Sequence, residues 1–193
     1  AGNEFLFQMQ ALQNIEVLNL YEVKKIVTTC PHCFNVLKNE YPALGGKYEV
    51  IHHSQFLNEL LKSGKLTTDN EKFKDVTYHD SCYLGRANEE YNAPREVLES
   101  LGVQITEMER AKANGLCCGA GGARMFMEET EGKHINIERT EELLETGAKT
   151  IALNCPFCMT MINDGVGSVG AENIQVKDIS EILLEHIEAN HKD

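Results

Sequence analysis

The hydrophobic and polar positions along the chain follow two different periods, which predicts helices and short strands in turn. Apolar residues recur at helical spacing near the start of the sequence, at Phe5, Met9, Leu12 and Ile15. Short apolar runs rich in β-branched residues are typical of strands. The pattern predicts helices over 4–20, 31–41, 54–63, 93–101, 123–146, 156–164 and 179–189, and strands over 25–29, 48–52, 75–79, 103–108, 149–154 and 173–177.

Strands that alternate with helices of about ten residues are typical of α/β proteins whose mainly parallel sheets are flanked by helices. We therefore predict an α/β fold of Rossmann-like type. A polar stretch over 62–75 separates two parts of the chain.

The sequence also contains an internal repeat. The segment KKIVTTCPHCFNVLKNEY at 24–41 is similar to KTIALNCPFCMTMINDGV at 149–166, with a constant shift of 125 residues and no gap. Each copy predicts a strand, then Cys-Pro-x-Cys, then a helix in which proline occupies the first turn. We interpret the repeat as a duplication.

The two copies differ in what precedes them. Cys82, Cys117 and Cys118 lie upstream of Cys155, whereas no cysteine lies upstream of Cys30. We therefore predict two pseudo-repeated units: residues 1–65 as the C-terminal part of a first unit truncated at its N-terminus, and residues 76–193 as a complete second unit. A native chain that starts at Ala1 after removal of its initiator methionine is the alternative.

Composition narrows the function classes. The 193 residues include 18 lysines and arginines against 30 aspartates and glutamates, a formal charge of −12. This charge argues against binding of nucleic acid or of an anionic membrane surface, since both need a basic surface. No apolar run approaches the roughly 20 residues of a membrane span, and the start of the chain lacks a signal-peptide pattern. We expect a cytoplasmic protein that reaches a membrane only through a partner or an upstream domain.

The seven cysteines are the main chemical signal. Their number is odd, and they form two Cys-x-x-Cys pairs, one adjacent pair and a single cysteine. In a chain without a secretory signal, such spacing favours metal binding or redox chemistry over a disulfide framework.

Several of these cysteines follow predicted strands, and the carboxyl ends of parallel strands lie along one edge of a sheet. We expect Cys82, Cys117, Cys118, Cys155 and Cys158 to converge there. Gly119 and Gly121 would let the backbone approach the sulfur atoms, with N–H groups free to donate to them. Five thiols exceed the four ligands of a structural zinc, and iron–sulfur clusters are commonly built from several thiolates. Spacing leaves open whether one thiolate bridges or one thiol stays free.

Three segments make the sequence recognisable: HDSCYLGR, GLCCGAGG and NCPFCMTM. Together they resemble the cysteine-rich CCG domain of heterodisulfide reductase and of the iron–sulfur subunits of glycolate, lactate and anaerobic glycerol-3-phosphate oxidoreductases. The resemblance implies a 4Fe–4S cluster, non-cubane in heterodisulfide reductase, and partner subunits or domains that carry flavin or iron–sulfur centres. It implies as cluster ligands Cys82, Cys117, Cys118, Cys155 and Cys158.

The resemblance also makes Cys30 and Cys33 the last two ligands of a first metal site, whose other three ligands are absent from these 193 residues. The function it implies is an electron-transfer module of a larger oxidoreductase, with disulfide reduction at the cluster as a sharper variant. Two other classes stay open: a scaffold domain with structural zinc, and a dithiol–disulfide redox protein that uses its Cys-x-x-Cys pairs.

Other polar residues have two interpretations each. Arg86 either offsets the negative charge of a bound cluster or pairs with carboxylates at the surface. His79 and Asp80, just before Cys82, either tune the centre through hydrogen bonds or cap the end of a strand. The pair at 52–53 has Lys177 and Asp178 at the equivalent repeat positions, which favours surface histidines over a metal site.

Overall fold

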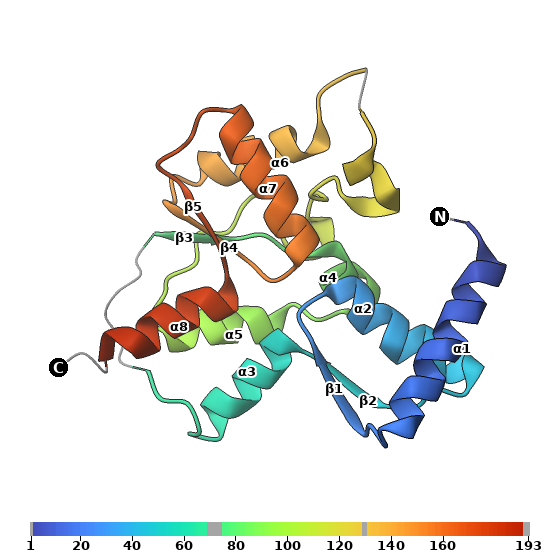
Figure 1. The fold of residues 1–193 in the computed structure, drawn as a ribbon. Coiled ribbons are helices and arrows are strands. Elements are labelled where there is room, and N and C mark those ends of the chain that lie inside the picture. Colours follow the sequence, from blue (N-terminus) through green and yellow to red (C-terminus); the bar gives the residue numbers. More distant parts are fainter. Residues whose placement is uncertain (1, 69–74, 129–130, 191–193) are drawn as a thin grey trace.

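The chain contains two small parallel sheets flanked by helices (Figure 1), and the computed structural model describes residues 2–68, 75–128 and 131–190. The strands are β1 (Lys25–Thr28), β2 (Glu49–His52), β3 (Val76–Tyr78), β4 (Thr150–Leu153) and β5 (Gln175–Asp178). The helices are α1 (Glu4–Leu20), α2 (Pro31–Asn35), α3 (His53–Lys62), α4 (Cys82–Asn88), α5 (Asn92–Ser100), α6 (Ile135–Glu145), α7 (Pro156–Ser168) and α8 (Ile179–Asn190). The predicted α/β class with parallel sheets is confirmed.

The order of the strands in the two sheets follows the internal repeat of the sequence. In one sheet β1 pairs with β2, and in the other β4 lies between β3 and β5, all in parallel. The register aligns Thr28 with His52 in the first sheet and Leu153 with Asp178 in the second. Because β1 and β4 are repeat counterparts, as are β2 and β5, the second sheet contains the same strand pair as the first, with β3 added.

The central strand of the second sheet, β4, is buried on both faces, which is why its residues after Thr150 are apolar. Ile151 and Leu153 point into a cluster with α6 and α7, while Ala152 points into a cluster with β3, α5 and α8. Figure 1 shows these two helix pairs on opposite sides of the strands. Parallel sheets are covered by helices on both faces, so the side chains on both faces of their strands are shielded from water.

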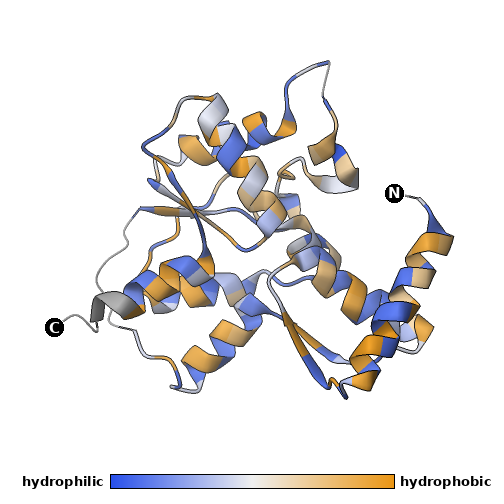
Figure 2. Ribbon diagram, in the orientation of Figure 1, coloured by the Kyte–Doolittle hydropathy of each residue, from blue (hydrophilic) through white to orange (hydrophobic). Residues whose placement is uncertain are grey.

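Helix α1 is less covered than its sequence suggests. Hydrophobic and hydrophilic residues alternate along it (Figure 2), but only Ala11 and Ile15 are buried. The predicted apolar stripe includes Phe5, which is 72% exposed, and Met9 and Leu12 are also exposed. Nothing in the described part of the chain covers this face.

Two predicted elements differ from the structure. The strand predicted over 103–108 is reduced to a single parallel bridge between Ile105 and Val76. The helix predicted over 123–146 is broken: Met127 has an extended backbone, and around the predicted start Gly122 and Ala123 have left-handed backbone angles that a right-handed helix cannot contain. These two residues lie in a short kinked 3-10 segment, Gly121–Phe126, and α6 begins only at Ile135. Residues 129–130, like 69–74 of the predicted linker, lie outside the described residues.

The helix predicted over 31–41 also ends early. It continues past Asn35 only as a π-helical turn, Val36–Glu40, and a 3-10 turn, Tyr41–Leu44. The seven-residue helix α4 was not predicted, because so short a segment offers little periodicity.

The prediction of surface histidines at 52–53 is wrong. His52 is fully buried and His53 is 5% exposed. His53 Nε2 lies 2.9 Å from an Asp178 carboxylate oxygen, in the other unit, and His52 Nδ1 accepts from the Ser54 backbone N–H at the start of α3. The repeat counterpart of His53 is therefore its hydrogen-bond partner, a relation that comparison of the two copies could not reveal.

Helices α6 and α7 pack closely through Gly165. A Cβ at this position would lie 2.1 Å from Thr140 Oγ1 and 3.0 Å from the Asn136 carbonyl oxygen. Both neighbours belong to α6, and Thr140 is fully buried. The absence of a side chain at Gly165 thus lets α7 lie against α6, beside the segment that carries Cys155 and Cys158.

We expect Gly165→Ala to lower the free energy of unfolding by about 1–3 kcal/mol, as overpacking does. Gly167→Ala in the same helix is the matched control, since a Cβ there meets nothing within 4 Å. The control should stabilise the protein by up to about 1 kcal/mol, because alanine is the better helix former. Urea unfolding of both variants measures this, and equal effects would contradict the packing role of Gly165.

Candidate metal centre

Five cysteines lie at the carboxyl ends of β3 and β4. Cys82 is the first residue of α4, a few residues after β3 ends. Cys117 and Cys118 lie in the loop before the 3-10 segment Gly121–Phe126. Cys155 precedes α7, and Cys158 lies in its first turn. Parallel pairing of β3 with β4 puts the segments that carry Cys82, Cys155 and Cys158 side by side.

The five sulfur atoms form a continuous series of contacts. Hydrogen bonds link the side chain of Cys82 to that of Cys117, Cys117 to Cys118, Cys118 to Cys158, and Cys158 to Cys155. All seven cysteines are free of disulfide bonds. The structure therefore brings together all five residues of the expected ligand set.

Backbone N–H groups face the sulfur atoms of the adjacent pair. The Gly119 N–H donates to Cys117 Sγ over an N···S distance of 3.4 Å, and that of Gly121 also donates to Cys117. The Ala120 N–H donates to Cys118. Gly119 has φ +94°, and a Cβ there would be 3.3 Å from Ile135. Such a conformation favours glycine, so both predicted glycines contribute backbone rather than side chains to the site.

These contacts divide the thiols into hydrogen-bond acceptors and donors. Hydrogen bonds from Cys118 and Cys82 hold the pKa of Cys117 far below its usual range. The bond from Cys158, with His32 adding to it, lowers the pKa of Cys155 to about 5. The same bonds raise the pKa of Cys82, and they raise that of Cys118 to about 12. Two thiolates are thus already stabilised without any metal.

The spread of the sulfur atoms tests which metal group fits. Ligands of a tetrahedral zinc at 2.3 Å lie about 3.8 Å apart, so four of them must lie mutually close. Among the described residues, the only group of possible ligand atoms within 4.8 Å of one another has three members: His79, Cys118 and Cys158. The five sulfurs extend beyond this group as a series, an arrangement that suits a group of several metal ions better than one ion.

His79 and Asp80 have separate roles at the end of β3. The Asp80 carboxylate accepts two hydrogen bonds from Arg95, at 2.8 and 2.9 Å, and one from the Lys112 backbone N–H at 2.7 Å. Asp80 therefore ties the strand end to α5 and to the loop that leads to the cysteine pair. His79 is fully buried beside the sulfur atoms.

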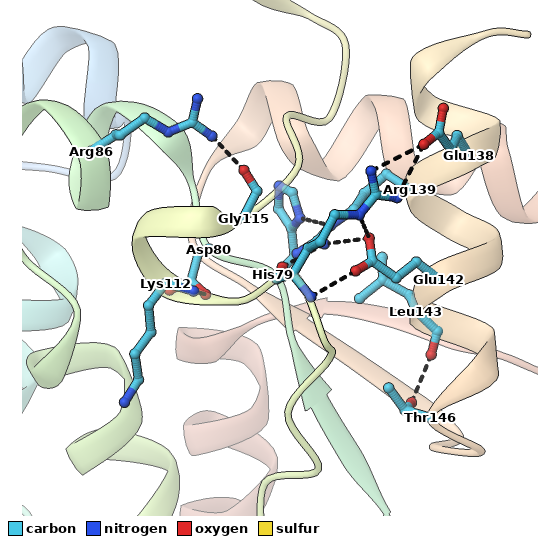
Figure 3. Close-up of polar contacts among 11 residues, drawn as sticks. His79, Asp80, Arg86, Lys112, Gly115, Glu138, Arg139, Glu142, Leu143 and Thr146 are labelled. Atoms are coloured by element: carbon cyan, nitrogen blue, oxygen red, sulfur yellow. Dashed lines mark hydrogen bonds and ion pairs between the residues drawn. The ribbon is translucent and has the colours of Figure 1, made fainter.

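Figure 3 shows His79 within a polar network on the side of the sheet that α6 covers. Its Nδ1 accepts a hydrogen bond from Arg139 Nε, and Arg139 in turn binds Glu142. Burial, with the positive charge of Arg139 beside it, lowers the pKa of His79 to about 3, so its imidazole is neutral at ordinary pH. Sequence reasoning missed Arg139, because it stands on a charged helix with no motif around it.

Arg86 contacts the loop rather than a sulfur atom. Its guanidinium donates to the Gly115 carbonyl, two residues before Cys117 (Figure 3). Arg86 thus positions the cysteine loop, and contact with a bound group stays a prediction.

Cys30 and Cys33 occupy the equivalent place in the first unit. Cys30 precedes α2, and Cys33 lies in it. His32, between them, has its Nδ1 3.9 Å from Cys30 Sγ and also bonds to Cys155, the repeat counterpart of Cys30. These bonds, to Cys155 and then Cys30, raise the pKa of His32 to about 9. The His32 ring also lies against Tyr83 at a tilt of 37° and meets Phe157 edge-on.

His32 was not predicted as a site residue. The signal in the sequence was its place inside Cys-Pro-His-Cys, but only the structure shows that its side chain reaches the second unit. One cysteine of each Cys-x-x-Cys pair thus interacts with the same imidazole.

Comparison with known proteins agrees with this geometry. The chain is 48% identical over 96% of its length to "Probable iron-sulfur-binding oxidoreductase FadF" of Bacillus subtilis, and 47% identical over 97% to "EtfAB:quinone oxidoreductase" of Syntrophomonas wolfei. It is 37% identical over 91% to a subunit of the "Dihydromethanophenazine:CoB--CoM heterodisulfide reductase" of Methanosarcina barkeri. The chain spans 27% of the first two relatives and 44% of the third.

The described part of the chain contains no helix that is long and apolar enough to cross a membrane. The family model of the "Cysteine-rich domain" called CCG matches residues 1–38 and 76–163, which include all seven cysteines. The chain therefore belongs to the CCG family of cysteine-rich domains.

Proposed function

We propose that the chain is an electron-transfer module of a larger iron–sulfur oxidoreductase, with a 4Fe–4S cluster held by Cys82, Cys117, Cys118, Cys155 and Cys158. The continuous series of five sulfur contacts carries this proposal. Such a cluster supplies one-electron chemistry when bound.

The chain's own groups suit an anionic, thiolate-rich centre. Cys155 and Cys158 are 1% and 2% exposed, so thiolates there lose hydration. Backbone N–H groups of the glycine-rich loop and the start of α7 replace that hydration, since the Phe157 and Cys158 N–H groups donate to Cys155. Burial and N–H donors are the means by which proteins set the potential of such centres.

Burial and the spacing of the ligand atoms argue against the two other classes of function. A dithiol–disulfide protein needs an accessible attacking sulfur, and Cys155, the thiol of lowered pKa in its pair, is buried. A zinc scaffold needs four mutually close ligands, which the described residues do not offer.

For Cys30 and Cys33 we propose a ligand role in a first site, completed by cysteines outside residues 1–193. Their repeat relation to Cys155 and Cys158 supports this, as does the short span of the chain within its relatives. We further propose that residues 1–65 and 76–193 are two CCG units, and that the partners are subunits or domains carrying flavin or iron–sulfur centres. A cytoplasmic location, with membrane contact only through such a partner, stays part of the proposal.

Removal of a ligand should abolish the cluster. We expect Cys82→Ser and Cys118→Ser, purified and reconstituted without oxygen, to lose the iron, the sulfide and the paramagnetic resonance signal of the unmodified chain. Serine keeps the size of the side chain but removes the soft thiolate ligand. Iron and sulfide analysis with paramagnetic resonance measures this.

Cys30→Ala is the matched control, because it removes a buried cysteine outside the set of five. It should leave the centre assembled, and loss of the centre in this variant would contradict the two-site assignment. A colourless unmodified chain with one equivalent of zinc would overturn the proposed function itself.

The metal-free protein offers a second test. Cys117 and Cys82 are similarly half-exposed, but hydrogen bonds lower the pKa of the first and raise that of the second. Since the thiolate is the nucleophile, iodoacetamide at pH 7 should alkylate Cys117 about tenfold faster than Cys82, or more. Mass spectrometry of the peptides measures both rates, and faster labelling of Cys82 would contradict the assigned hydrogen bonds.

A further inference from the structure

His79 lies beside the sulfur atoms, where it could serve either as a metal ligand or as a hydrogen-bond donor. One of its ring nitrogens lies within 4.8 Å of the Sγ atoms of Cys118 and Cys158. A neutral histidine among thiolates is a common metal ligand, so proximity alone favours ligation. The opposite edge of the ring decides between the two roles.

Arg139 occupies that opposite edge. Its Nε donates to His79 Nδ1 over 3.0 Å, and its guanidinium is fixed by Glu142 at 2.8 Å and by the Arg110 carbonyl at 2.9 Å (Figure 3). Arg139 is fully buried, as is His79. A guanidinium has donors only, so Nδ1 must present its lone pair to it.

The proton of the neutral ring is therefore on Nε2. This nitrogen is buried and has no hydrogen-bond partner among the residues that the structure describes. With Nδ1 occupied by Arg139, Nε2 is the nitrogen left to face Cys118 and Cys158. A ring nitrogen that bears a proton has no lone pair for a metal, but it is a good donor.

We propose that Arg139 fixes the Nε2–H tautomer of His79, so that His79 is not a ligand but, once the cluster is bound, donates a hydrogen bond to the thiolate sulfur of Cys118 or Cys158. The proposal rests on the proposed function insofar as it concerns the bound cluster. His79 acts through the sulfur atom and not as a ligand. Its N–H stabilises negative charge on that sulfur, and this charge increases when the cluster is reduced. The contact thus raises the reduction potential of the centre, and does so strongly because the surroundings are dry.

The tautomer can be tested without any metal. In the ¹⁵N-labelled, metal-free chain, long-range ¹H–¹⁵N correlation spectra should show His79 protonated at Nε2 and bare at Nδ1. Arg139→Met removes the hydrogen bond to His79 Nδ1, so the spectra should show a mixture of the two tautomers. A ring protonated at Nδ1 in the unmodified chain would overturn the proposal.

The effect on the centre is tested by redox titration followed by paramagnetic resonance. We expect His79→Leu to bind iron fully but to shift the equilibrium toward the oxidised form by about tenfold, which is about 59 mV lower potential for a one-electron couple. His79→Gln, which keeps an N–H donor, should recover most of this shift. Loss of iron in a folded His79→Leu, or an unchanged potential, would overturn the proposal.

His186→Leu is the matched control, because His186 is another buried histidine but belongs to α8 and lies outside the group around Cys118. It should leave the potential unchanged, and an equal fall in potential would show that any buried histidine acts alike, against the proposal.

If the unmodified chain binds no cluster, the proposed function fails, whereas the tautomer in the metal-free chain still decides the role of Arg139. If His79→Leu does not fold, the tautomer in the unmodified chain and in Arg139→Met still decides the proposal.

Discussion

Parallel pairing between β3 and β4 is the constraint on which the site depends. It places the ends of two strands that are far apart in the sequence side by side, and the segments that follow them carry Cys82, Cys155 and Cys158. Ser81 links the two segments, since its hydroxyl donates to Asn154 Oδ1 at 2.8 Å and lies 3.7 Å from Cys158 Sγ. The sheet is thus the rigid element, and the cysteines are short extensions of it.

A second requirement is electrostatic. Several thiolates within a buried site repel one another and lose hydration, which is costly unless donors replace the water. The N–H groups of Gly119, Ala120 and Gly121 replace this water. The His79–Arg139 pair is the further donor that we propose for the bound cluster. Polar residues at the edges of the site, such as Asp80 and Arg86, instead hold the loops that present these donors.

The tertiary structure brings the two copies of the internal repeat into contact. Residues 125 positions apart touch each other at two places: His32 against Phe157, and His53 against Asp178. At these two places, counterpart residues of the two copies therefore lie against each other although they are far apart in the sequence. The structure also brings Cys30 and its counterpart Cys155 to the same imidazole, that of His32.

The sequence by itself determined the α/β class, the repeat and the identity of the five cysteines, because strand and helix periods, repeated motifs and thiol spacing are local properties. Only the tertiary structure decided how the sulfur atoms bond to one another, that Arg139 reaches His79, and that His53 is buried against Asp178. It also shortened the predicted helix 123–146, because Ala123 is left-handed, Met127 is extended and α6 begins at Ile135. These features depend on backbone handedness and on contacts between distant segments, which periodicity does not encode.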